Sequence, residues 1–432
     1  MKQNIGVVGG GFTGLTAAYY LLKKGHKVTI FEKGNSLGGL AGGFRINGNN
    51  LEKAYHHIFK TDKDIISLSE ELKLTEKLKW IESSIGIYYK GKVSPFVTPM
   101  DLLRFEGLGL LDKLRLGLVG LLLQKDKGWG KYIEVPAFEW MKKMCGKRAY
   151  RVIWEPLLKG KFHKYYDKVS MAWLWARIHT RGNSKDKGDT KEFLGYYDGG
   201  FQVLIDKLEE KIKKMGGVIV VGVGIEKVGK KQKKVFLKVE GKNIEFDKVV
   251  ATVPSNVFAK IAQNSLDEKY KKQLSSIDYL GAIVFIFSSK QSLSKYYWHN
   301  INDINSPFLA FIQHTNLIDK SNYGDEEVYY MGTYAPHDHK FFRVKDEDVE
   351  KEYFDYLQKI FPNFDKRQVR QKFLFKLRDA QHVVTCDYPQ KIPDYKTSIE
   401  GVYLANFSQI FPEDRGTNFA VREGKKIANL VG

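Results

Sequence analysis

A glycine-rich turn near the start of the chain constrains the fold more than any other feature. Residues 5–8 are mostly apolar and β-branched, as in a buried parallel strand, and Gly9, Gly11 and Gly14 follow with G-x-G-x-x-G spacing. Residues 13–24 then place apolar side chains at helical spacing. The first glycine permits a tight turn, the second lets the backbone approach a pyrophosphate, and the third lets helix and strand pack closely. We therefore expect the N-terminus of this helix to bind the phosphates of a dinucleotide.

An acidic residue follows at the position where such proteins contact a ribose. Gly25 ends the helix, residues 27–31 form the next strand, and Glu32 comes 23 residues after Gly9. A carboxylate there accepts hydrogen bonds from ribose hydroxyls and repels a 2′-phosphate. Strand, glycines, helix, strand and acid in this order predict a Rossmann-type unit, with a purely structural βαβ turn as the alternative.

A second glycine cluster distinguishes between NAD and FAD. After Glu32 come Lys33 and then Gly38, Gly39, Gly42 and Gly43. A bound NAD needs no second glycine-rich loop at this point. A longer cofactor does, because its diphosphate and ribityl chain extend past the first helix. FAD is therefore the predicted cofactor.

Residues 6–43 resemble the N-terminal signature of the FAD-dependent amine oxidase superfamily, which includes protoporphyrinogen oxidases and phytoene-type desaturases. Residues 196–228, 246–262 and 401–431 resemble later segments of the same superfamily. Many members have Gly-Asp after the last strand, where this chain has Asn406 and Phe407, so the usual acidic contact is missing. The resemblance implies that the following residues contact FAD: Gly9, Gly11, Phe12, Thr13, Gly14, Glu32, Lys33, Gly38, Gly39, Leu40, His57, Val223 (through its backbone, at the adenine), Asn406, Gly416, Thr417 and Asn418.

The resemblance also implies the architecture, an α/β fold with a Rossmann-type, GR2-like FAD-binding domain, an antiparallel-sheet substrate domain and a helical cap. Because both chain ends build one cofactor site, the FAD-binding domain is expected to be discontinuous, with segments 1–90, 200–262 and 395–432. Residues 91–199 form the expected cap and residues 263–394 the substrate domain. Strand patterns at 279–287 and 327–335, separated by hairpin-like loops, favour an antiparallel sheet.

The expected cap carries five of the seven tryptophans within a helix-rich stretch, residues 101–184. Ordinary core packing explains such aromatic side chains. The alternative is an apolar tunnel for a polycyclic or isoprenoid substrate, with residues 105–124 lying on a membrane surface as an interfacial helix. The sequence leaves both interpretations open.

Two adjacent histidines, His56 and His57, stand in the motif YHHIFKTD. On a strand they would point to opposite faces and could not bind one metal ion, so we predict no metal site. The motif also resembles the HIFHT of UDP-galactopyranose mutases, with His57 in the matching place. A histidine beside a flavin can hydrogen-bond to the N5 or O4 edge and stabilise charge on the reduced ring. A core histidine satisfied by a carbonyl is the alternative.

Further candidates for a substrate site come from two segments. Arg177 and Arg181 are spaced i, i+4 on a predicted helix, where they could clamp a carboxylate or phosphate, or simply be solvated at a helix end. His382 and Tyr388 precede the last cofactor segment, where superfamily members place groups that face the ring. The predicted catalytic residues are His57, His56, Arg181 and Tyr388.

The charge of the chain favours anionic partners. The net charge is +20, from 70 Lys and Arg against 50 Asp and Glu, although a generally lysine-rich composition is the simpler explanation. We expect a small-molecule substrate, no nucleic acid, and possible contact with an anionic membrane surface. Two cysteines make no disulfide framework, the first strand begins near residue 3, and the longest apolar run is residues 116–123, so a cytoplasmic or peripheral protein is expected.

These features predict an FAD-dependent oxidoreductase in which flavin N5 accepts a hydride from a C–H bond of an apolar or anionic substrate, creating a C–C or C–N double bond. The resemblance places it nearest to protoporphyrinogen-oxidase-like and desaturase-like enzymes. One alternative is a UDP-galactopyranose-mutase-like enzyme, which uses reduced FAD without net redox. A second is a prenyl-binding module like the Rab GDP-dissociation inhibitors, against which the intact glycines and Glu32 argue.

Overall fold

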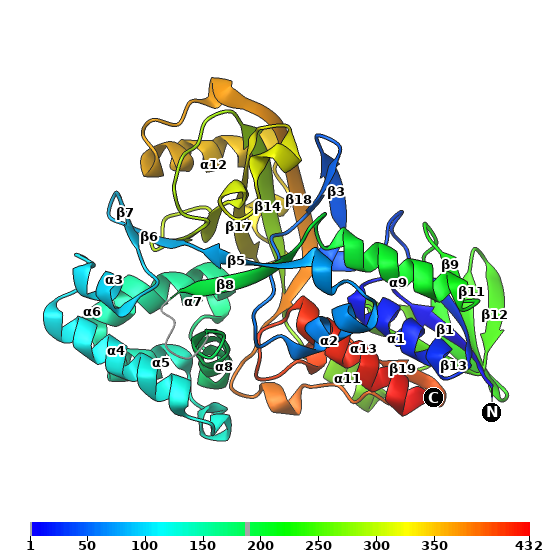
Figure 1. Cartoon of the computed structure of the whole chain (residues 1–432). Coiled ribbons are helices and arrows are strands. Elements are labelled where there is room, and N and C mark those ends of the chain that lie inside the picture. The colour runs from blue at the N-terminus through cyan, green and yellow to red at the C-terminus, as the bar shows by residue number, and fades with distance from the viewer. Residues whose placement is uncertain (1, 186–190) are drawn as a thin grey trace.

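The chain folds into two sheet-containing parts with a helical cap at one side (Figure 1). The structure is a computed structural model that describes residues 2–185 and 191–432. Both ends of the chain lie in the part built on the parallel sheet, where the last helix packs beside the first (Figure 1).

The first sheet has five parallel strands in the order β19-β13-β1-β2-β9. They are β1 (Asn4–Val8), β2 (Lys27–Phe31), β9 (Val218–Val220), β13 (Lys248–Ala251) and β19 (Val402–Leu404). One face shares an apolar core with α1 (Phe12–Lys23), α2 (Lys63–Glu71), α9 (Gln202–Lys214) and α13 (Thr417–Val431). The other face packs against β10 (Lys227–Lys231), β11 (Lys234–Val239), β12 (Lys242–Phe246), α10 (Ser255–Ile261) and α11 (Glu268–Ser275). Three distant chain segments therefore supply one sheet.

The second sheet has seven strands in the order β18-β14-β17-β16-β15-β6-β7. They are β6 (Ile85–Tyr89), β7 (Lys92–Pro95), β14 (Tyr279–Ser289), β15 (Trp298–Ile301), β16 (Ala310–Gln313), β17 (Glu327–Ala335) and β18 (Val369–His382). Side chains alternate along β14, so Phe285 packs toward α12 (Asp346–Ile360) while Ala282 and Val284 lie in the core on the opposite face. Two ribbons complete the sheet structure, β3 (Gly43–Ile46) with β4 (Asn49–Glu52) and β5 (Leu78–Ser83) with β8 (Glu192–Tyr197).

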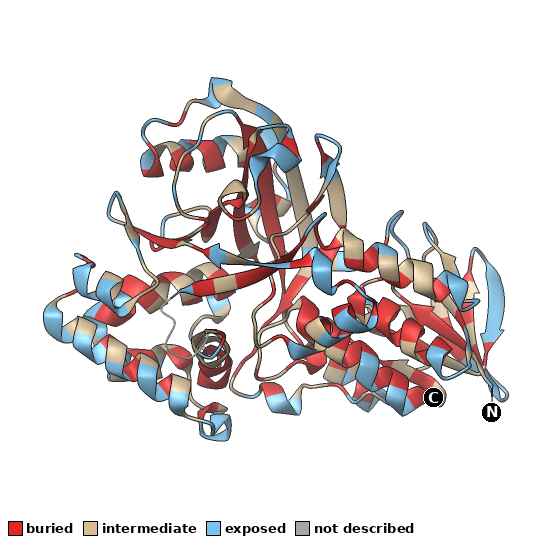
Figure 2. Cartoon of the chain, in the orientation of Figure 1, coloured by how far each residue is buried: buried red, intermediate tan, exposed pale blue. Residues whose placement is uncertain are grey.

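The cap is built from α3 (Pro99–Arg104), α4 (Leu110–Lys125), α5 (Ala137–Cys145), α6 (Lys147–Ala149), α7 (Glu155–Phe162) and α8 (Met171–Gly182). Its core buries Trp173, which meets Phe162 edge to face with ring centroids 4.8 Å apart, and most of Trp175. Core packing therefore accounts for these two aromatic residues. By contrast, α4 is exposed along its outer side (Figure 2). Within the described residues, no helix combines the length and apolar character needed to cross a membrane.

Most predicted elements are present, and three details differ from the prediction. β6 falls inside the first segment expected for the FAD-binding domain, but it pairs in the second sheet. The same strand runs parallel to β15, so the second sheet is antiparallel except at this pair. In the cap, the predicted helix at 105–124 begins only at Leu110. The domain division drawn from the sequence stays a prediction.

Candidate functional site

The glycine turn between β1 and α1 leaves bare backbone at the start of the helix. Gly9 has φ +109°, and a Cβ on Gly14 would lie 2.0 Å from the carbonyl oxygen of Gly9, so helix and turn are in direct contact. Gly11 is the N-cap of α1 and offers no side chain to the first N–H groups, which begin at Phe12 and Thr13. An anion can therefore approach these N–H groups and the positive end of the helix dipole.

Glu32 lies at the end of β2 beside the glycine turn. Its carboxylate accepts hydrogen bonds from the backbone N–H of Gly10 at 2.6 Å and of Gly34 at 2.7 Å. The N–H of Val223 donates to the carbonyl oxygen of Glu32 at 3.0 Å, which aligns the segment after β9 with this residue, and the side chain of Lys33 is exposed. The acid predicted for the ribose and the backbone predicted for the adenine therefore lie next to each other.

The second glycine cluster packs on the first through backbone contacts. The N–H of Gly38 donates to the carbonyl oxygen of Gly10 at 2.8 Å, and a Cβ on Gly39 would lie 3.2 Å from the Cα of Gly11. Gly38 has φ +105°, and the half-buried Leu40 follows in a short 3₁₀ helix, Gly39–Ala41. The two clusters form one continuous backbone surface, as an extended diphosphate and ribityl chain requires.

The C-terminal helix completes this surface. A Cβ on Gly424 would lie 2.6 Å from the carbonyl oxygen of Thr13, so the middle of α13 crosses the start of α1 at close range. Gly416 is the N-cap of α13 and has no capping side chain, while Asn418 Oδ1 accepts from the N–H of Ile65 at 3.0 Å. The helix starts of α1 and α13 thus belong to one packed unit.

Asn406 is held within the protein. Its Nδ2 donates to the carbonyl oxygen of Val253 at 2.8 Å, its Oδ1 accepts from Ser408, and its backbone N–H donates to Gln409. The amide therefore fixes the turn after β19, and its side-chain groups are engaged by protein partners.

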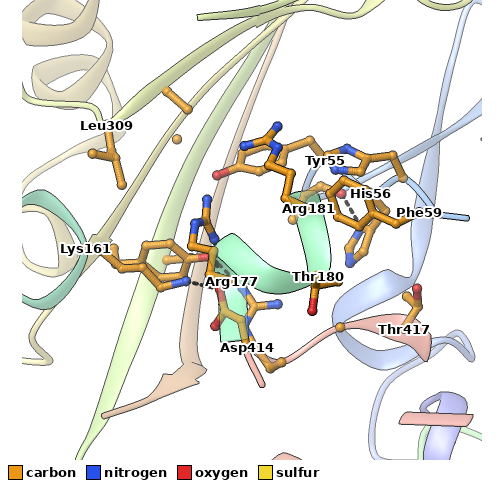
Figure 3. A pocket seen from close by; sticks show the side chains of 18 of the residues that line it. Tyr55, His56, Phe59, Lys161, Arg177, Thr180, Arg181, Leu309, Asp414 and Thr417 are labelled. Carbon is orange, nitrogen blue, oxygen red and sulfur yellow. Dashed lines mark hydrogen bonds and ion pairs between the residues drawn. The ribbon is translucent and has the colours of Figure 1, made fainter. Parts of the chain in front are cut away.

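A cavity of about 230 Å³ opens where the second sheet, the cap and the start of α13 meet (Figure 3). Its floor includes small apolar residues of the sheet, Ala282, Val284, Ala310 and Gly332, and its roof comes from α7 and α8. Toward the parallel sheet it is bounded by residues 54–59 and by 413–419, which include Gly416, Thr417 and Asn418. The cavity therefore adjoins the helix start that the sequence predicts to contact the cofactor.

Both predicted histidines line this cavity, in a segment that is not a strand. His56 Nδ1 lies 2.6 Å from the carbonyl oxygen of Ala54, which satisfies it locally. Within the described residues, the hydrogen-bond contact of His57 is a long one, 3.5 Å from its Nδ1 to the hydroxyl of Tyr297, and its ring lies against Phe59. Burial lowers the pKa of His56 to about 4, with Arg415 contributing, and lowers the pKa of His57 to about 3, with Arg181 contributing. Both rings are therefore neutral near pH 7.

The predicted arginine pair also reaches the cavity, and each guanidinium already has a carboxylate partner. Arg181 Nε lies 3.1 Å from Glu192 Oε1, and Arg177 Nη1 lies 3.1 Å from Asp414 Oδ2. Figure 3 shows Arg177, Thr180 and Arg181 on one side of α8, directed into the cavity.

His382 and Tyr388 are not brought together with these residues. Both are fully buried, with ring centroids 5.1 Å apart, and the Tyr388 hydroxyl donates to the carbonyl oxygen of Ser408 at 2.7 Å. Neither appears among the described residues that line the cavity. Tyr388 therefore packs the core behind the turn after β19.

The cavity residues that were not singled out from the sequence include Lys161, Tyr334, Asp414 and Arg415. Lys161 is one lysine among many in a basic cap, and Tyr334 is one tyrosine of a strand rich in them. A usable signal existed only for Asp414 and Arg415, which directly precede the glycine that caps the last helix. Among the residues that the structure describes, no cluster of three His, Cys, Asp or Glu side chains could hold a metal ion.

Buried neutral histidines give a prediction for the pH dependence of stability. His314 is 3% exposed, and burial lowers its pKa to about 3, whereas an unfolded chain binds the proton near pH 6.5. As pH falls below about 6.5, His314 binds a proton in the unfolded state but stays neutral in the folded state. The free energy of unfolding therefore decreases. Urea denaturation between pH 7 and pH 5 is expected to show this loss. In the His314→Gln variant, the free energy of unfolding should fall less steeply with decreasing pH, by up to about 1.4 kcal/mol per pH unit. The same dependence of this free energy on pH in the variant and the unmodified protein would contradict the prediction.

Known proteins that resemble this chain include oxidases and a desaturase. The family model for flavin containing amine oxidoreductases matches residues 12–406. Coproporphyrinogen III oxidase of Staphylococcus aureus is 24% identical over 294 residues, 60% of this chain and 62% of that protein. The 15-cis-phytoene desaturase of Glycine max is 23% identical over 434 residues, 93% of this chain and 74% of that protein. A solved triple mutant of putrescine oxidase has a TM-score of 0.75 at 14% identity and covers 100% of this chain and 98% of its own.

Proposed function

Because this chain belongs to the family of flavin containing amine oxidoreductases, we propose that it oxidises a small-molecule substrate in the cavity beside α13. The protein is a flavin-dependent oxidoreductase and its cofactor is FAD. FAD supplies a two-electron acceptor at its flavin N5. The observation that carries the proposal is the position of the cavity, whose lining includes both the start of α13 and the segment with His57.

The residues that would hold FAD lie along one path through the parallel-sheet part. Glu32 and the backbone of Val223 would bind the adenosine end, and the start of α1 with Gly11 would bind the diphosphate. Gly38, Gly39 and Leu40 would flank the ribityl chain. The bare N–H groups after Gly416 would face the flavin and favour negative charge on it.

The cavity residues would place the substrate and exclude water. Neutral His57 can donate or accept a hydrogen bond at the edge of the ring without adding charge. The small side chains of the sheet leave room for an apolar substrate over the ring, and the cap closes the other side. The bond to be oxidised would be a C–H next to carbon or nitrogen, as in porphyrinogen oxidation or desaturation.

Anaerobic reduction of the bound flavin tests this function. Holoprotein mixed with porphyrinogens, polyprenoids or amines in separate reactions is expected to lose its absorbance at about 450 nm with one of these classes, with no added reductant. A flavin that stays oxidised with all three, while a UDP-sugar perturbs the spectrum of the reduced protein, would instead favour the mutase activity.

We further propose that the cap docks on an anionic membrane through a patch of exposed side chains on α3 and α4. This leucine patch comprises Met100, Leu103, Leu110, Leu111, Leu114, Leu118, Leu121 and Leu122, each between 44% and 82% exposed. On α4 the patch residues recur at helical spacing on one face, and Leu116, Val119 and Leu123 are buried on the other. Contiguous exposed apolar surface of this kind marks an interaction site.

The charge of the cap selects a lipid surface over a second copy of the chain. Residues 91–185 contain 19 Lys and Arg against eight Asp and Glu. Two such surfaces repel each other, whereas an anionic bilayer attracts the basic rim while the leucines enter the acyl boundary.

Vesicle binding checks this docking surface. Leu111→Glu with Leu118→Glu is expected to weaken sedimentation with phosphatidylglycerol vesicles at least about tenfold, because two apolar anchors become charged. Leu430→Glu, an exposed leucine of α13 outside the patch, serves as the matched control and should bind as the unmodified protein does. Equal binding of all three proteins, or a dimer that only the double variant disrupts, would remove the membrane assignment.

A further inference from the structure

A group of charges, of which Lys161 is buried and the others are partly buried, lies where the cap meets the start of α13. Lys161 of α7 is only 3% exposed, and its Nζ lies 2.6 Å from Asp414 Oδ2. Arg177 of α8 contacts the same oxygen at 3.1 Å, and Arg415 follows Asp414 in the chain. Figure 3 shows Lys161, Arg177 and Asp414 together at one side of the cavity. Lys161 and Arg177 therefore share one carboxylate oxygen of Asp414, and the positive charge of Arg415 acts on the same carboxylate.

Two further carboxylates near this group, Glu413 and Glu192, have arginine partners of their own. Glu413 pairs with Arg422 at 2.9 Å, and Glu192 pairs with Arg181 at 3.1 Å. The corner formed by Lys161, Arg177, Asp414 and Arg415 therefore keeps an excess of positive charge, and Lys161 within it is only 3% exposed. Buried charges are normally paired, so this excess calls for an anion.

Two hydrogen-bond donors of the corner are unused. Arg415 Nη2 donates to the Tyr334 hydroxyl at 2.9 Å, but within residues 2–185 and 191–432 its buried Nε has no partner. In the same described part of the chain, the hydroxyl of Tyr334 accepts this bond and donates to no protein group. Burial raises the pKa of Tyr334, yet Arg415 and Lys161 lower it by more, so its pKa lies below the usual value. The positive field of the corner therefore reaches this side chain.

We infer that the corner binds a carboxylate of the substrate, with Arg415 Nε and Tyr334 Oη as donors and Lys161 and Arg177 as the surrounding charge. A planar carboxylate with two oxygens matches two neighbouring donors. A phosphate dianion fits less well, because Asp414 keeps a second oxygen, Oδ1, that is buried without a partner. Most of the sheet residues that line the cavity are apolar, with Asn300 and Thr333 as polar exceptions, so the substrate class is an apolar carboxylic acid. This inference rests on the proposed function and names the substrate class of the same cavity.

Binding of a matched pair of probes tests the inference. The FAD-loaded protein is titrated with 4-phenylbutanoate and with uncharged 4-phenylbutanamide, followed by calorimetry and by the flavin absorbance. The carboxylate is expected to bind at least tenfold more tightly than the amide. Arg415→Met should weaken carboxylate binding tenfold to a hundredfold, Arg415→Lys less, and Tyr334→Phe about tenfold, with no change for the amide.

Arg370→Met is the control, since Arg370 is exposed on β18 and lies outside the cavity. Equal binding of the two probes, no binding of the carboxylate, or the same loss in Arg370→Met and Arg415→Met would overturn the inference. A yellow protein that substrates reduce would leave the proposed function intact in each of these cases. If Arg415→Met does not retain flavin, the titration of Tyr334→Phe with the two probes decides whether the corner binds the carboxylate.

Discussion

Gly14→Ala is expected to give a protein that is strongly destabilised and nearly colourless. The added Cβ would lie 2.0 Å from the carbonyl oxygen of Gly9 and 2.9 Å from Thr252 Oγ1, far inside any real contact. The turn has to open and α1 has to move away from β1, which costs roughly 3 kcal/mol of unfolding free energy. The displaced N–H groups no longer meet the diphosphate, so bound flavin per chain should fall at least tenfold. Urea denaturation and the ratio of flavin to protein absorbance measure both effects.

Gly120→Ala is the matched control for this substitution. Gly120 lies in the exposed helix α4, and no described atom lies within 4 Å of the position of an added Cβ. Alanine favours a helix over glycine by about 1 kcal/mol, so this variant should keep its flavin and its stability. If Gly14→Ala were as yellow and as stable as Gly120→Ala, the glycine turn would not be the phosphate site.

Asp414→Asn is expected to cost about 3–5 kcal/mol of unfolding free energy, because it leaves buried cations without their carboxylate. Lys161 and Arg177 both contact Asp414 Oδ2, and they belong to the cap helices α7 and α8. The substitution therefore also loosens the attachment of the cap to the segment before α13. Denaturation curves measure the stability, and limited proteolysis within the cap measures the loosening.

Glu268→Gln provides the comparison for an exposed ion pair. Glu268 is 90% exposed and pairs with Lys271 on the surface of α11, so its loss should cost less than about 1 kcal/mol. Equal effects of the two substitutions would show that the buried group around Asp414 does not stabilise the cap.

Local sequence signals predicted the glycine turns and the first strands and helix of the parallel-sheet part. Few residue types allow the backbone geometry of the glycine turns, which is why Gly9, Gly14 and the second glycine cluster could be interpreted from the sequence. Glu32 was identified by its spacing from these glycines, and it lies beside the turn. The meeting of the two chain ends followed from the resemblance of residues 401–431 to a known segment rather than from any local rule. The structure places α13 directly on α1 through Gly424.

The second sheet and the cap were less predictable, because pairing between strands far apart in the sequence determines how they fold. β6 is an apolar strand like many others. Its residues do not indicate that it pairs in parallel with β15, which follows more than 200 residues later in the chain. Arg181 was singled out as a clamp, yet it pairs with Glu192, whereas the Nε of Arg415 has no hydrogen-bond partner in the part of the chain that the structure describes. Tyr388 was singled out from the sequence and Tyr334 was not, yet the fold puts Tyr388 in the core and Tyr334 in the cavity.

The position of FAD in a crystal structure of the holoprotein tests the central claim most directly. We predict the diphosphate at the start of α1 beside Gly11 and Gly38, and the flavin ring at the start of α13, open to the cavity that His57 lines. A cofactor bound away from either helix start, or a native protein that stays colourless and does not take up FAD, would contradict the account.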